Sequence, residues 1–362
     1  MADRPIAVLG GGNGAHMMAV DLTYRGHKVH LFEHSEFRAG FQVTLERKAI
    51  ESSGVGPRGR FPIERVTMDM GEALEGVEWI NVVIPANGHD LFFAEMIPYL
   101  RDDQKVVVWA GDYGSLRLKA LLREKHGVEV TIIETNTLPY GTRLREPGWI
   151  ELLLVAPHVM ASAIPAKKNA EIIEPFKSLF PCIDGAKNVF ACAFNNPNPI
   201  VHPPGSLLNT GRIQYAKGNF YMYREGITEA VARVIREVYN ESGRVAARFD
   251  VEMIPYEDTD FDTTVSIMGV EFVAPFDTMG EIASILGPTS VDDRYITEDL
   301  PYGLVPRSEL GRVVGVTTPL IDSLITIGSV VCRNHYWTTG RTLRSLGLDG
   351  WSREEILQAL NG

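Results

Sequence analysis

The sequence predicts an α/β protein whose first half is a doubly wound parallel sheet and whose second half is dominated by helices. Three observations lead to this fold class. Residues 5–33 show the order strand, glycine turn, helix, strand, and short apolar runs then alternate with helical segments. Around residues 186–205 the chain becomes rich in proline and asparagine, and helical patterns follow. We therefore expect two domains, residues 1–186 and 187–362.

Composition narrows the class of partner. The chain has 362 residues, a formal net charge of −11 and 45% hydrophobic residues, enough for two cores. The charge argues against nucleic acid as the main partner, because phosphate binding needs a basic surface. No run reaches the roughly 20 apolar residues that span a bilayer, and the N-terminal apolar run is too short for a signal peptide. We expect a cytoplasmic protein without a membrane partner. The sequence does not show the oligomeric state, and a homodimer is retained as one candidate assembly.

Three cysteines, Cys182, Cys192 and Cys332, are expected to be buried, reduced thiols. Their spacings match no zinc pattern, and an odd number does not suggest a disulfide framework. We therefore expect no metal site.

In the first half, residues 6–9 and 29–32 are short runs typical of strands, and the helix between them ends at Gly26. A later helix is expected at residues 116–125. Four further apolar runs fit additional strands of the same buried parallel sheet. They are residues 79–84, 106–109, 130–133 and 152–155.

The second half contains amphipathic and apolar helical patterns. Thr228 is a suitable N-cap for a helix whose apolar residues lie within 230–238. Residues 317–331 predict a second long helix with Pro319 near its first turn. Residues 351–360 predict a short terminal helix.

A glycine-rich turn follows the first strand and fits the pattern G-x-G-x-x-A. Gly10 permits the tight turn, Gly12 lets the backbone approach a pyrophosphate, and Ala15 allows close contact between helix and strand. The helix N-terminus offers N–H groups and partial positive charge to the phosphates. The turn predicts a Rossmann-type dinucleotide site; the alternative is a glycine-rich turn in an unrelated α/β domain. The candidate cofactor contacts here are Gly10, Gly12, Asn13, Gly14 and Ala15.

The second strand is followed by a carboxylate. Glu33 lies 23 residues after Gly10, where it can accept hydrogen bonds from the adenosine ribose hydroxyls. It favours NAD by repelling a 2′-phosphate. His34, Ser35 and Arg38 follow closely and can receive such a phosphate, so Arg38 is a candidate contact and NADP stays the alternative.

Residues 79–84 are followed by Pro85, Ala86 and Asn87. A strand that ends in such a turn can border the nicotinamide side of the cofactor, so Pro85 and Ala86 are candidate cofactor contacts. An ordinary break between strand and loop explains the pattern equally well.

A hydride transfer to C=N or C=O needs a proton donor, and His202 is the strongest local candidate. It lies at the expected junction between the domains. Asn198, four residues earlier, shares its face if the segment is helical, although Pro203 disfavours helical geometry at His202. The alternative is a structural or surface histidine.

A charged segment begins at Arg294 and includes Glu298 and Asp299. A carboxylate beside His202 would fix its tautomer and stabilise the imidazolium. Spacing alone does not decide between Glu298 and Asp299, and the alternative is a solvated charged loop.

At these residues the sequence resembles the opine dehydrogenase family, which includes octopine and nopaline dehydrogenases and the bacterial N-(1-carboxyethyl)-norvaline dehydrogenase. The resemblance covers almost the whole chain. The segments that carry it are GGGNGA at 10–15, NPIVHP at 198–203, LLN at 207–209, EGIT at 225–228, residues 294–306, SELGR at 308–312 and GRTL at 340–343.

The resemblance implies that the chain condenses an amino acid with a 2-oxo acid, by analogy pyruvate, and reduces the resulting imine with NAD(P)H. It implies a catalytic pair of His202 and Asp299, with Arg294 facing the cofactor phosphates or a substrate carboxylate. The second domain would be an all-helical substrate domain. Residues that would line the substrate side are Asn198, Thr137 and Tyr140.

Two other functions stay open. Hydroxyacid dehydrogenases of the ketopantoate reductase or 6-phosphogluconate dehydrogenase type use a lysine one turn before an asparagine. Phe194 stands at that position, four residues before Asn198, and cannot donate a proton. A catalytically silent NAD(P)-binding regulator would keep the glycine turn and have no need of His202. The sequence does not identify the amino acid, the 2-oxo acid or the physiological direction.

Overall fold

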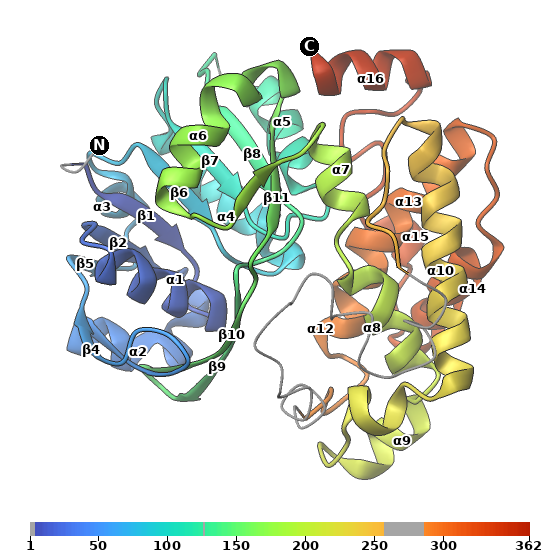
Figure 1. The fold of residues 1–362 in the computed structure, drawn as a ribbon, viewed down its shortest axis with the longest axis horizontal. Coiled ribbons are helices and arrows are strands. Elements are labelled where there is room, and N and C mark those ends of the chain that lie inside the picture. The colour runs from blue at the N-terminus through green and yellow to red at the C-terminus, as the bar shows by residue number, and fades with distance from the viewer. Residues whose placement is uncertain (1–3, 126, 257–285) are drawn as a thin grey trace. The chain divides into compact units, whose positions relative to one another are not determined.

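The computed structural model describes residues 4–125, 127–256 and 286–362 (Figure 1). The chain divides after Gly185 into two compact units, residues 1–185 and 186–362. No helix within the described ranges is both long and apolar enough to cross a lipid bilayer.

Within the described residues, the first unit is built on an eight-stranded sheet with the order β12-β11-β8-β7-β6-β1-β2-β5. Its neighbouring strands are parallel, apart from the antiparallel pair β8 and β11. The predicted Rossmann-type parallel sheet is confirmed. The strands are β1 (Ile6–Leu9), β2 (Val29–Phe32), β5 (Arg65–Thr67), β6 (Trp79–Val82), β7 (Lys105–Val108), β8 (Thr131–Thr135), β11 (Val159–Ile164) and β12 (Ile183–Gly185).

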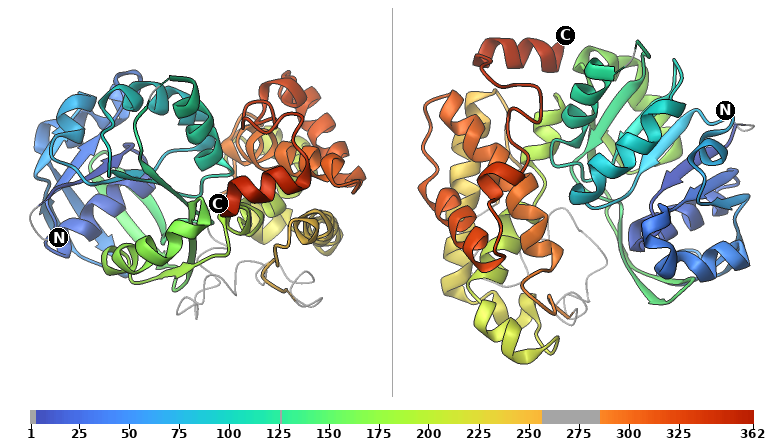
Figure 2. Two further views of the ribbon diagram at one scale, coloured as in Figure 1. Left: turned by 90° about the horizontal axis from the view of Figure 1, so that it is seen from above. Right: turned by 180° about the vertical axis from the view of Figure 1, so that it is seen from behind.

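Helices lie against both faces of this sheet (Figure 2), which is why every residue of the central strand β1 is buried. The helices are α1 (Asn13–Tyr24), α2 (Arg38–Arg47), α3 (Met70–Leu74), α4 (His89–Met96), α5 (Gly114–Lys125) and α6 (Asn169–Leu179).

The prediction that residues 152–155 join the parallel sheet is wrong. They belong to β10 (Trp149–Val155), which pairs in parallel with β3 (Ala49–Gly54) and antiparallel with β9 (Tyr140–Glu146). With β4 (Gly59–Pro62), these strands form a separate four-stranded sheet that packs on α1. Buried and more exposed residues alternate along β10, as in a sheet covered on one face.

Every element that the structure describes in the second unit is helical, as predicted. Thr228 is the N-cap residue of α10, and α14 begins at Pro319. The α-helices are α7 (Val189–Phe194), α8 (Asn198–Leu207), α9 (Thr210–Ala216), α10 (Glu229–Arg248), α12 (Arg294–Thr297), α13 (Val305–Val313), α14 (Pro319–Val331), α15 (Tyr336–Thr339) and α16 (Arg353–Asn361). Two π-helical turns, Met222–Gly226 and Asp299–Leu304, lie between them.

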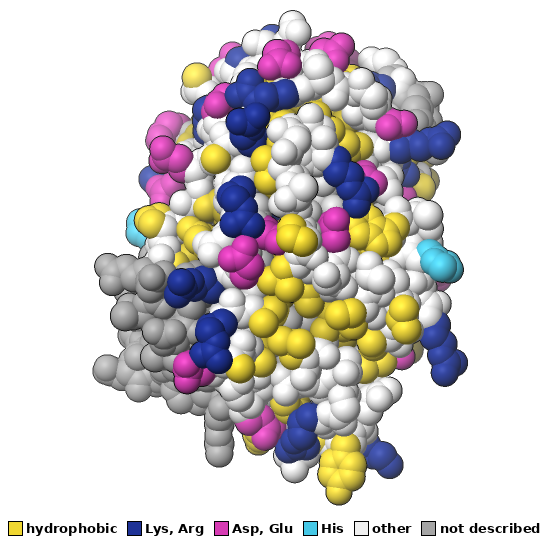
Figure 3. All heavy atoms as spheres, turned by 90° about the vertical axis from the view of Figure 1, so that its right-hand side faces the viewer, with side chains coloured by type: hydrophobic (Ala, Val, Ile, Leu, Met, Phe, Trp, Pro, Cys, Tyr) yellow, Lys and Arg dark blue, Asp and Glu magenta, His cyan; other side chains and the backbone are white. Residues whose placement is uncertain are grey.

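One exposed face of the helical unit carries apolar side chains (Figure 3). On α14, Ile327 and Val330 are 48% and 76% exposed. Exposed apolar patches of this kind are typical of contact surfaces.

The thiols are partly as predicted. Cys192 is buried, whereas Cys182 and Cys332 are only half-buried because they lie at the ends of helices or strands. Burial nevertheless raises the pKa of Cys182 to about 11, which keeps it protonated at neutral pH. No group of three or more His, Cys, Asp or Glu side chains among the described residues is arranged to hold a metal ion.

Candidate active site

Helix α8 carries Asn198 and His202 one turn apart. The helix continues through Pro203 and Pro204, so the expectation that Pro203 disfavours helical geometry at His202 is wrong. Each proline removes one N–H and the hydrogen bond to the carbonyl four residues earlier. Residues 199–207 are all buried, and this packing holds the helix where its backbone hydrogen bonding is incomplete.

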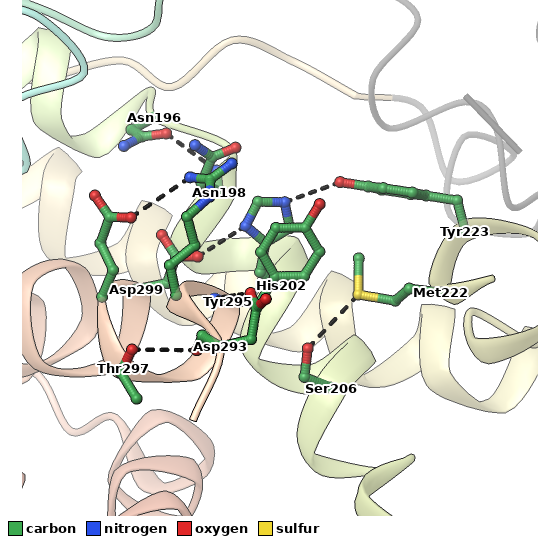
Figure 4. Close-up of polar contacts among 12 residues, drawn as sticks. Asn196, Asn198, His202, Ser206, Met222, Tyr223, Asp293, Tyr295, Thr297 and Asp299 are labelled. Atoms are coloured by element: carbon green, nitrogen blue, oxygen red, sulfur yellow. Dashed lines mark hydrogen bonds and ion pairs between the residues drawn. The ribbon is translucent and has the colours of Figure 1, made fainter. Parts of the chain in front are cut away.

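The imidazole of His202 is hydrogen-bonded at both nitrogens (Figure 4). Nδ1 lies 2.7 Å from Oδ2 of Asp299, and Nε2 lies 2.8 Å from the hydroxyl of Tyr223. Only 4% and 2% of the His202 and Asp299 side-chain surfaces are exposed. An ionised carboxylate can only accept a hydrogen bond, so the ionised form of Asp299 places the proton on Nδ1 and leaves Nε2 to exchange protons.

The structure brings Asp299, and not Glu298, to the histidine. Asp299 begins the π-helical turn that follows α12, and Glu298 pairs instead with Nη1 of Arg294 at 3.4 Å. The Arg294 guanidinium also lies 5.4 Å from the centre of the Tyr295 ring. The same Tyr295 ring stacks on His202 with centroids 3.8 Å apart and planes at 11°.

Burial raises the pKa of Asp299 well above its ordinary value, and the negative charge of Glu298 acts in the same direction. The positive charges of Arg294 and Arg307 oppose this shift. The proton affinity of the dyad is therefore set by burial and by these three neighbouring charges, and not by the histidine alone.

Tyr223, Tyr295 and Arg307 adjoin the dyad and are not identified by the sequence analysis. Tyr295 directly follows Arg294 in the charged segment, and that adjacency is a usable signal. Tyr223 comes from a π-helical turn and Arg307 from a helix interior, and no sequence pattern marks either one.

Arg307 on α13 is fully buried and connects the chain segments that carry the dyad. Its guanidinium donates to the end of α7 and to the link between α7 and α8, just before the helix of His202. Helix α13 itself directly follows the turn of Asp299. The acceptors are the carbonyl oxygens of Ala193 at 2.9 Å, Phe194 at 3.3 Å and Asn196 at 3.1 Å, and Oγ of Ser242 at 3.2 Å.

Replacing Arg307 by methionine is expected to destabilise the protein. Methionine keeps most of the apolar contacts but leaves buried carbonyl groups without a donor, at a cost of about 3 kcal/mol in the free energy of unfolding. Urea denaturation measures this loss, and activity should fall with it because the link to α8 relaxes. Arg307→Lys keeps a hydrogen-bond donor and should recover part of the stability and part of the activity. A methionine variant with unchanged stability and activity contradicts the role.

The glycine turn between β1 and α1 has the features that a pyrophosphate needs. Gly10 has a φ of 126°, and a Cβ there would lie 2.4 Å from the carbonyl oxygen of Val83. Gly12 is the N-cap of α1 and makes no side-chain capping bond, and a Cβ there would meet no described atom within 4 Å. The first turn of α1 thus offers uncapped N–H groups beside open space, which fits a dinucleotide phosphate.

The neighbouring positions of the turn have packing contacts of their own. Asn13 Oδ1 accepts a hydrogen bond from the backbone N–H of Leu144 at 2.7 Å. A Cβ on Gly14 would lie 2.8 Å from a methyl group of Leu138, and Ala15 is fully buried. Cofactor contacts by these three residues stay predictions.

Glu33 is only 7% exposed and lies against the glycine turn. Its Oε1 accepts a hydrogen bond from the N–H of His34 at 2.8 Å, and a Cβ on Gly11 would lie 2.5 Å from its Oε2. Burial raises the pKa of Glu33. In dinucleotide sites a carboxylate after the second strand binds the ribose hydroxyls, and this role of Glu33 stays a prediction.

Two of the groups that could receive a 2′-phosphate, His34 and Arg38, are already engaged. Nε2 of His34 lies 3.3 Å from a carboxylate oxygen of Glu95, and Arg38 Nη1 donates to Gln42 at 3.2 Å. Glu95 thus adds a negative charge beside His34. This arrangement favours NAD over NADP.

Glu33→Ala is expected to weaken the binding of NADH more than the binding of NADPH. The alanine removes the acceptor for the ribose hydroxyls and the charge that repels a 2′-phosphate, so the two dissociation constants should converge. Quenching of protein fluorescence measures both constants. If the unmodified protein already binds NADPH tenfold more tightly than NADH, the assignment of Glu33 is wrong.

The remaining predicted contacts lie in the first unit. Pro85 is the N-cap of a 3₁₀ turn after β6, and Ala86 in that turn is buried. Thr137 is buried, and the Tyr140 hydroxyl donates to Oδ2 of Asp21 at 2.7 Å. Contacts of these residues with cofactor or substrate stay predictions.

Known proteins match the chain over almost its whole length. Residues 185–332 match the model of the NAD/NADP octopine/nopaline dehydrogenase α-helical domain. An opine dehydrogenase of Arthrobacter sp. (strain 1C) is 31% identical over 362 residues, covering 99% of both chains.

Solved structures share the fold. Octopine dehydrogenase with NADH and L-arginine has a TM-score of 0.74 at 20% identity, and with NADH and pyruvate a TM-score of 0.71 at 20% identity. Both comparisons cover 98% of each chain. Yersinopine dehydrogenase with NADP⁺ has a TM-score of 0.70 at 14% identity and covers 99% of this chain and 98% of that one.

The full-length match to a curated relative decides the family. The helical unit matches the family's α-helical domain, and the parallel sheet with the helical unit matches the fold of octopine dehydrogenase. The chain belongs to the opine dehydrogenase family of NAD(P)-dependent oxidoreductases, which act on CH–NH donors and reductively condense an amino acid with a 2-oxo acid.

Proposed function

We propose that this chain joins the amino group of an amino acid to a small 2-oxo acid, pyruvate in the first instance, and that His202 and Asp299 handle the proton. The observation that carries the assignment of these residues is their buried contact of 2.7 Å within a member of this family. Octopine dehydrogenase, solved with pyruvate and with L-arginine, supports pyruvate as the oxo acid and leaves the amino acid open.

NADH, when bound, supplies the hydride. Reduction of the substrate imine also requires a proton at nitrogen, and the His202 imidazolium is its source. In the reverse direction the substrate nitrogen must lose that proton, and neutral imidazole accepts it at Nε2. Asp299 orients the ring and stabilises its charged form. The half-exposed guanidinium of Arg294 is available to a substrate carboxylate.

NAD is the proposed cofactor, because Glu33 and the engagement of His34 by Glu95 disfavour a 2′-phosphate. NADP is the alternative, supported by the NADP⁺ complex of yersinopine dehydrogenase.

The experiment that tests this function follows NADH oxidation with pyruvate and a panel of acidic, basic and apolar amino acids. We expect the rate to depend on the amino acid and to saturate with it. NADH oxidation by the 2-oxo acid alone, unchanged by any amino acid, would favour a hydroxyacid dehydrogenase. No turnover with any pair would favour a silent NAD(P)-binding regulator.

A shift in pH dependence is expected from Glu298→Gln. A proton on Asp299 removes the charge that stabilises the imidazolium, so amine oxidation should fall as the pH drops through the pKa of the dyad. Because burial and Glu298 raise the pKa of Asp299, this acid limb should lie above the usual carboxyl range of about 4. Neutral glutamine removes one of these causes and should move the limb to lower pH in a profile of kcat/KM.

Two controls complete the pH measurement. Arg294 and Arg307, the cations that face Asp299, stay in place in the Glu298→Gln variant, and Asp293 contributes a second negative charge. Asp293→Asn removes this second charge. It should also move the acid limb of the pH profile to lower pH, but by less than Glu298→Gln does. An unmoved or raised limb in the glutamine variant contradicts the assignment of the limb to Asp299.

Assembly and location complete the proposal. The exposed apolar side chains of α14 support a homodimer. The thiols of Cys182 and Cys332, whose pKa values are raised, suit a reducing cytoplasm. Light scattering in solution distinguishes a particle of 40.1 kDa from one of twice that mass.

A further inference from the structure

The nitrogen of His202 that should exchange protons is covered by another side chain. Asp299 holds Nδ1, the Tyr295 ring covers one face, and the Tyr223 hydroxyl lies 2.8 Å from Nε2. His202 is 3% exposed and Tyr223 is 5% exposed. A substrate nitrogen therefore meets Nε2 either through the Tyr223 hydroxyl or after displacing it.

We propose that Tyr223 is a further catalytic residue, whose hydroxyl relays the proton between His202 Nε2 and the substrate nitrogen. The proposal rests on the proposed function. In amine oxidation, the substrate N–H proton passes to the Tyr223 oxygen while the Tyr223 O–H proton passes to Nε2. The C–H bond of the substrate gives its hydride to NAD⁺, and the C=N bond forms. The tyrosine is a neutral phenol before and after the step, and the histidine gains one positive charge.

A phenol hydroxyl suits this exchange because it donates one hydrogen bond and accepts others at the same oxygen. When His202 is neutral, the hydroxyl donates to Nε2 and its lone pairs can accept from an amine N–H. When His202 is protonated, Nε2–H donates to the phenol oxygen, and the O–H can turn toward an imine nitrogen. Both directions of the reaction thus use the same chain of hydrogen bonds, with the donor and acceptor roles exchanged.

The position of Tyr223 is fixed by the helix that carries His202. Tyr223 lies in the π-helical turn Met222–Gly226, a type of turn that is frequent at functional sites. Asn209, just after α8, donates one side-chain amide to the carbonyls of Gly205 and Gly226, both at 2.9 Å. The same turn is closed at its start, where Glu225 Oε1 accepts from the N–H of Tyr221 at 2.9 Å.

Side-chain packing adds a second connection to α8. Ser206 Oγ donates to the Met222 sulfur at 3.6 Å, and a Cβ on Gly205 would lie 3.0 Å from that sulfur. The close approach of the turn to α8 brings the hydroxyl of Tyr223 to Nε2 as part of the fold (Figure 4).

Tyr223→Phe in the full-length protein tests the relay, because it keeps the ring and removes only the hydroxyl. We expect the rate of hydride transfer in amine oxidation, followed by NADH absorbance in a single turnover, to fall by about 10²-fold. The dissociation constants of NADH and substrate should change little. Tyr215→Phe on α9, whose side chain is 86% exposed, is the matched control and should leave the rate unchanged.

A solvent isotope measurement distinguishes a proton relay through Tyr223 from a side chain that only shields Nε2 of His202. A relay moves two protons in one step. In mixtures of H₂O and D₂O, the rate of the unmodified protein should therefore depend non-linearly on the fraction of D₂O. The phenylalanine variant should lose that curvature. Should phenylalanine disturb folding, a fluorinated tyrosine at position 223 keeps the shape, and a relay predicts a rate that follows the acidity of its phenol.

A hydride-transfer rate within twofold of the unmodified protein in Tyr223→Phe, or a rate increase with tighter substrate binding, would overturn the relay and make Tyr223 a removable cover. The proposed function is judged separately, by the amine dependence of the unmodified protein in the same assay. An amine-dependent enzyme with an active phenylalanine variant thus refutes the relay alone.

Discussion

Alanine in place of His202 is expected to lower kcat by about 10²–10⁴-fold, the usual contribution of a general acid–base group. The imidazole is the group that takes the proton in amine oxidation and returns it in imine reduction. Its contacts with Asp299, Tyr223 and Tyr295 all lie in the helical unit, whereas the glycine turn lies in the first unit. The dissociation constant of NADH, measured by fluorescence, should therefore change little.

Asp299→Asn provides the partner experiment. Asparagine keeps the size of the side chain but removes the charge that stabilises the imidazolium, so kcat should fall while NADH binding persists. Because the two residues form one unit, the double variant should be far less than multiplicatively worse than the singles. Independent, multiplicative losses, or a nearly native kcat in His202→Ala, would show that the proton is handled elsewhere.

Gly12→Ala is expected to abolish most cofactor binding without unfolding the protein. Gly12 has a φ of −83°, which alanine adopts readily, and its Cβ would meet no described atom within 4 Å. The added methyl group would instead occupy the space where the pyrophosphate approaches the backbone. Overpacking of about 1–3 kcal/mol corresponds to roughly 5-fold to 140-fold weaker NADH binding.

Gly10→Ala is the matched contrast in the same turn. At a φ of 126°, with the Val83 carbonyl oxygen 2.4 Å from the new Cβ, alanine must strain the backbone. We expect a loss of about 1–3 kcal/mol in the free energy of unfolding. Thermal unfolding and NADH titration of both variants separate the two effects. Normal NADH affinity in Gly12→Ala would mean that the cofactor does not approach this turn.

The beginning of the chain is predictable because its signals are local. The runs at residues 6–9 and 29–32 form β1 and β2 with those bounds, since fully buried parallel strands are predominantly apolar; within these two runs only His30 is polar. The glycine turn and the helix after it follow from residues that are neighbours in sequence.

The second sheet is not predictable from the same signal. Leu152, Leu153 and Leu154 form a continuous apolar run, which hides the alternation between buried and more exposed positions along β10. An apolar run indicates a strand and does not state which sheet it joins. That choice depends on pairing with β3, almost a hundred residues earlier.

In the candidate site, too, some features follow from local sequence signals and others depend on contacts between distant segments. His202 was predicted from its place at the domain junction, whereas Asp299, 97 residues away, was assigned through the family resemblance. The helical geometry at Pro203 and the buried link by Arg307 depend on packing between distant segments, which no spacing reveals. Tyr223 reaches the imidazole from an irregular turn, and local propensity gives no signal for such a contact.

The most direct test of the account is the identity of the product formed with NADH deuterated at the transferred position. With pyruvate and an accepted amino acid, mass spectrometry and NMR should find a secondary amine that contains both carbon skeletons. Its deuterium should lie on the carbon derived from the 2-oxo acid, next to the nitrogen of the amino acid. A deuterated 2-hydroxy acid, formed with or without the amino acid, would contradict reductive condensation.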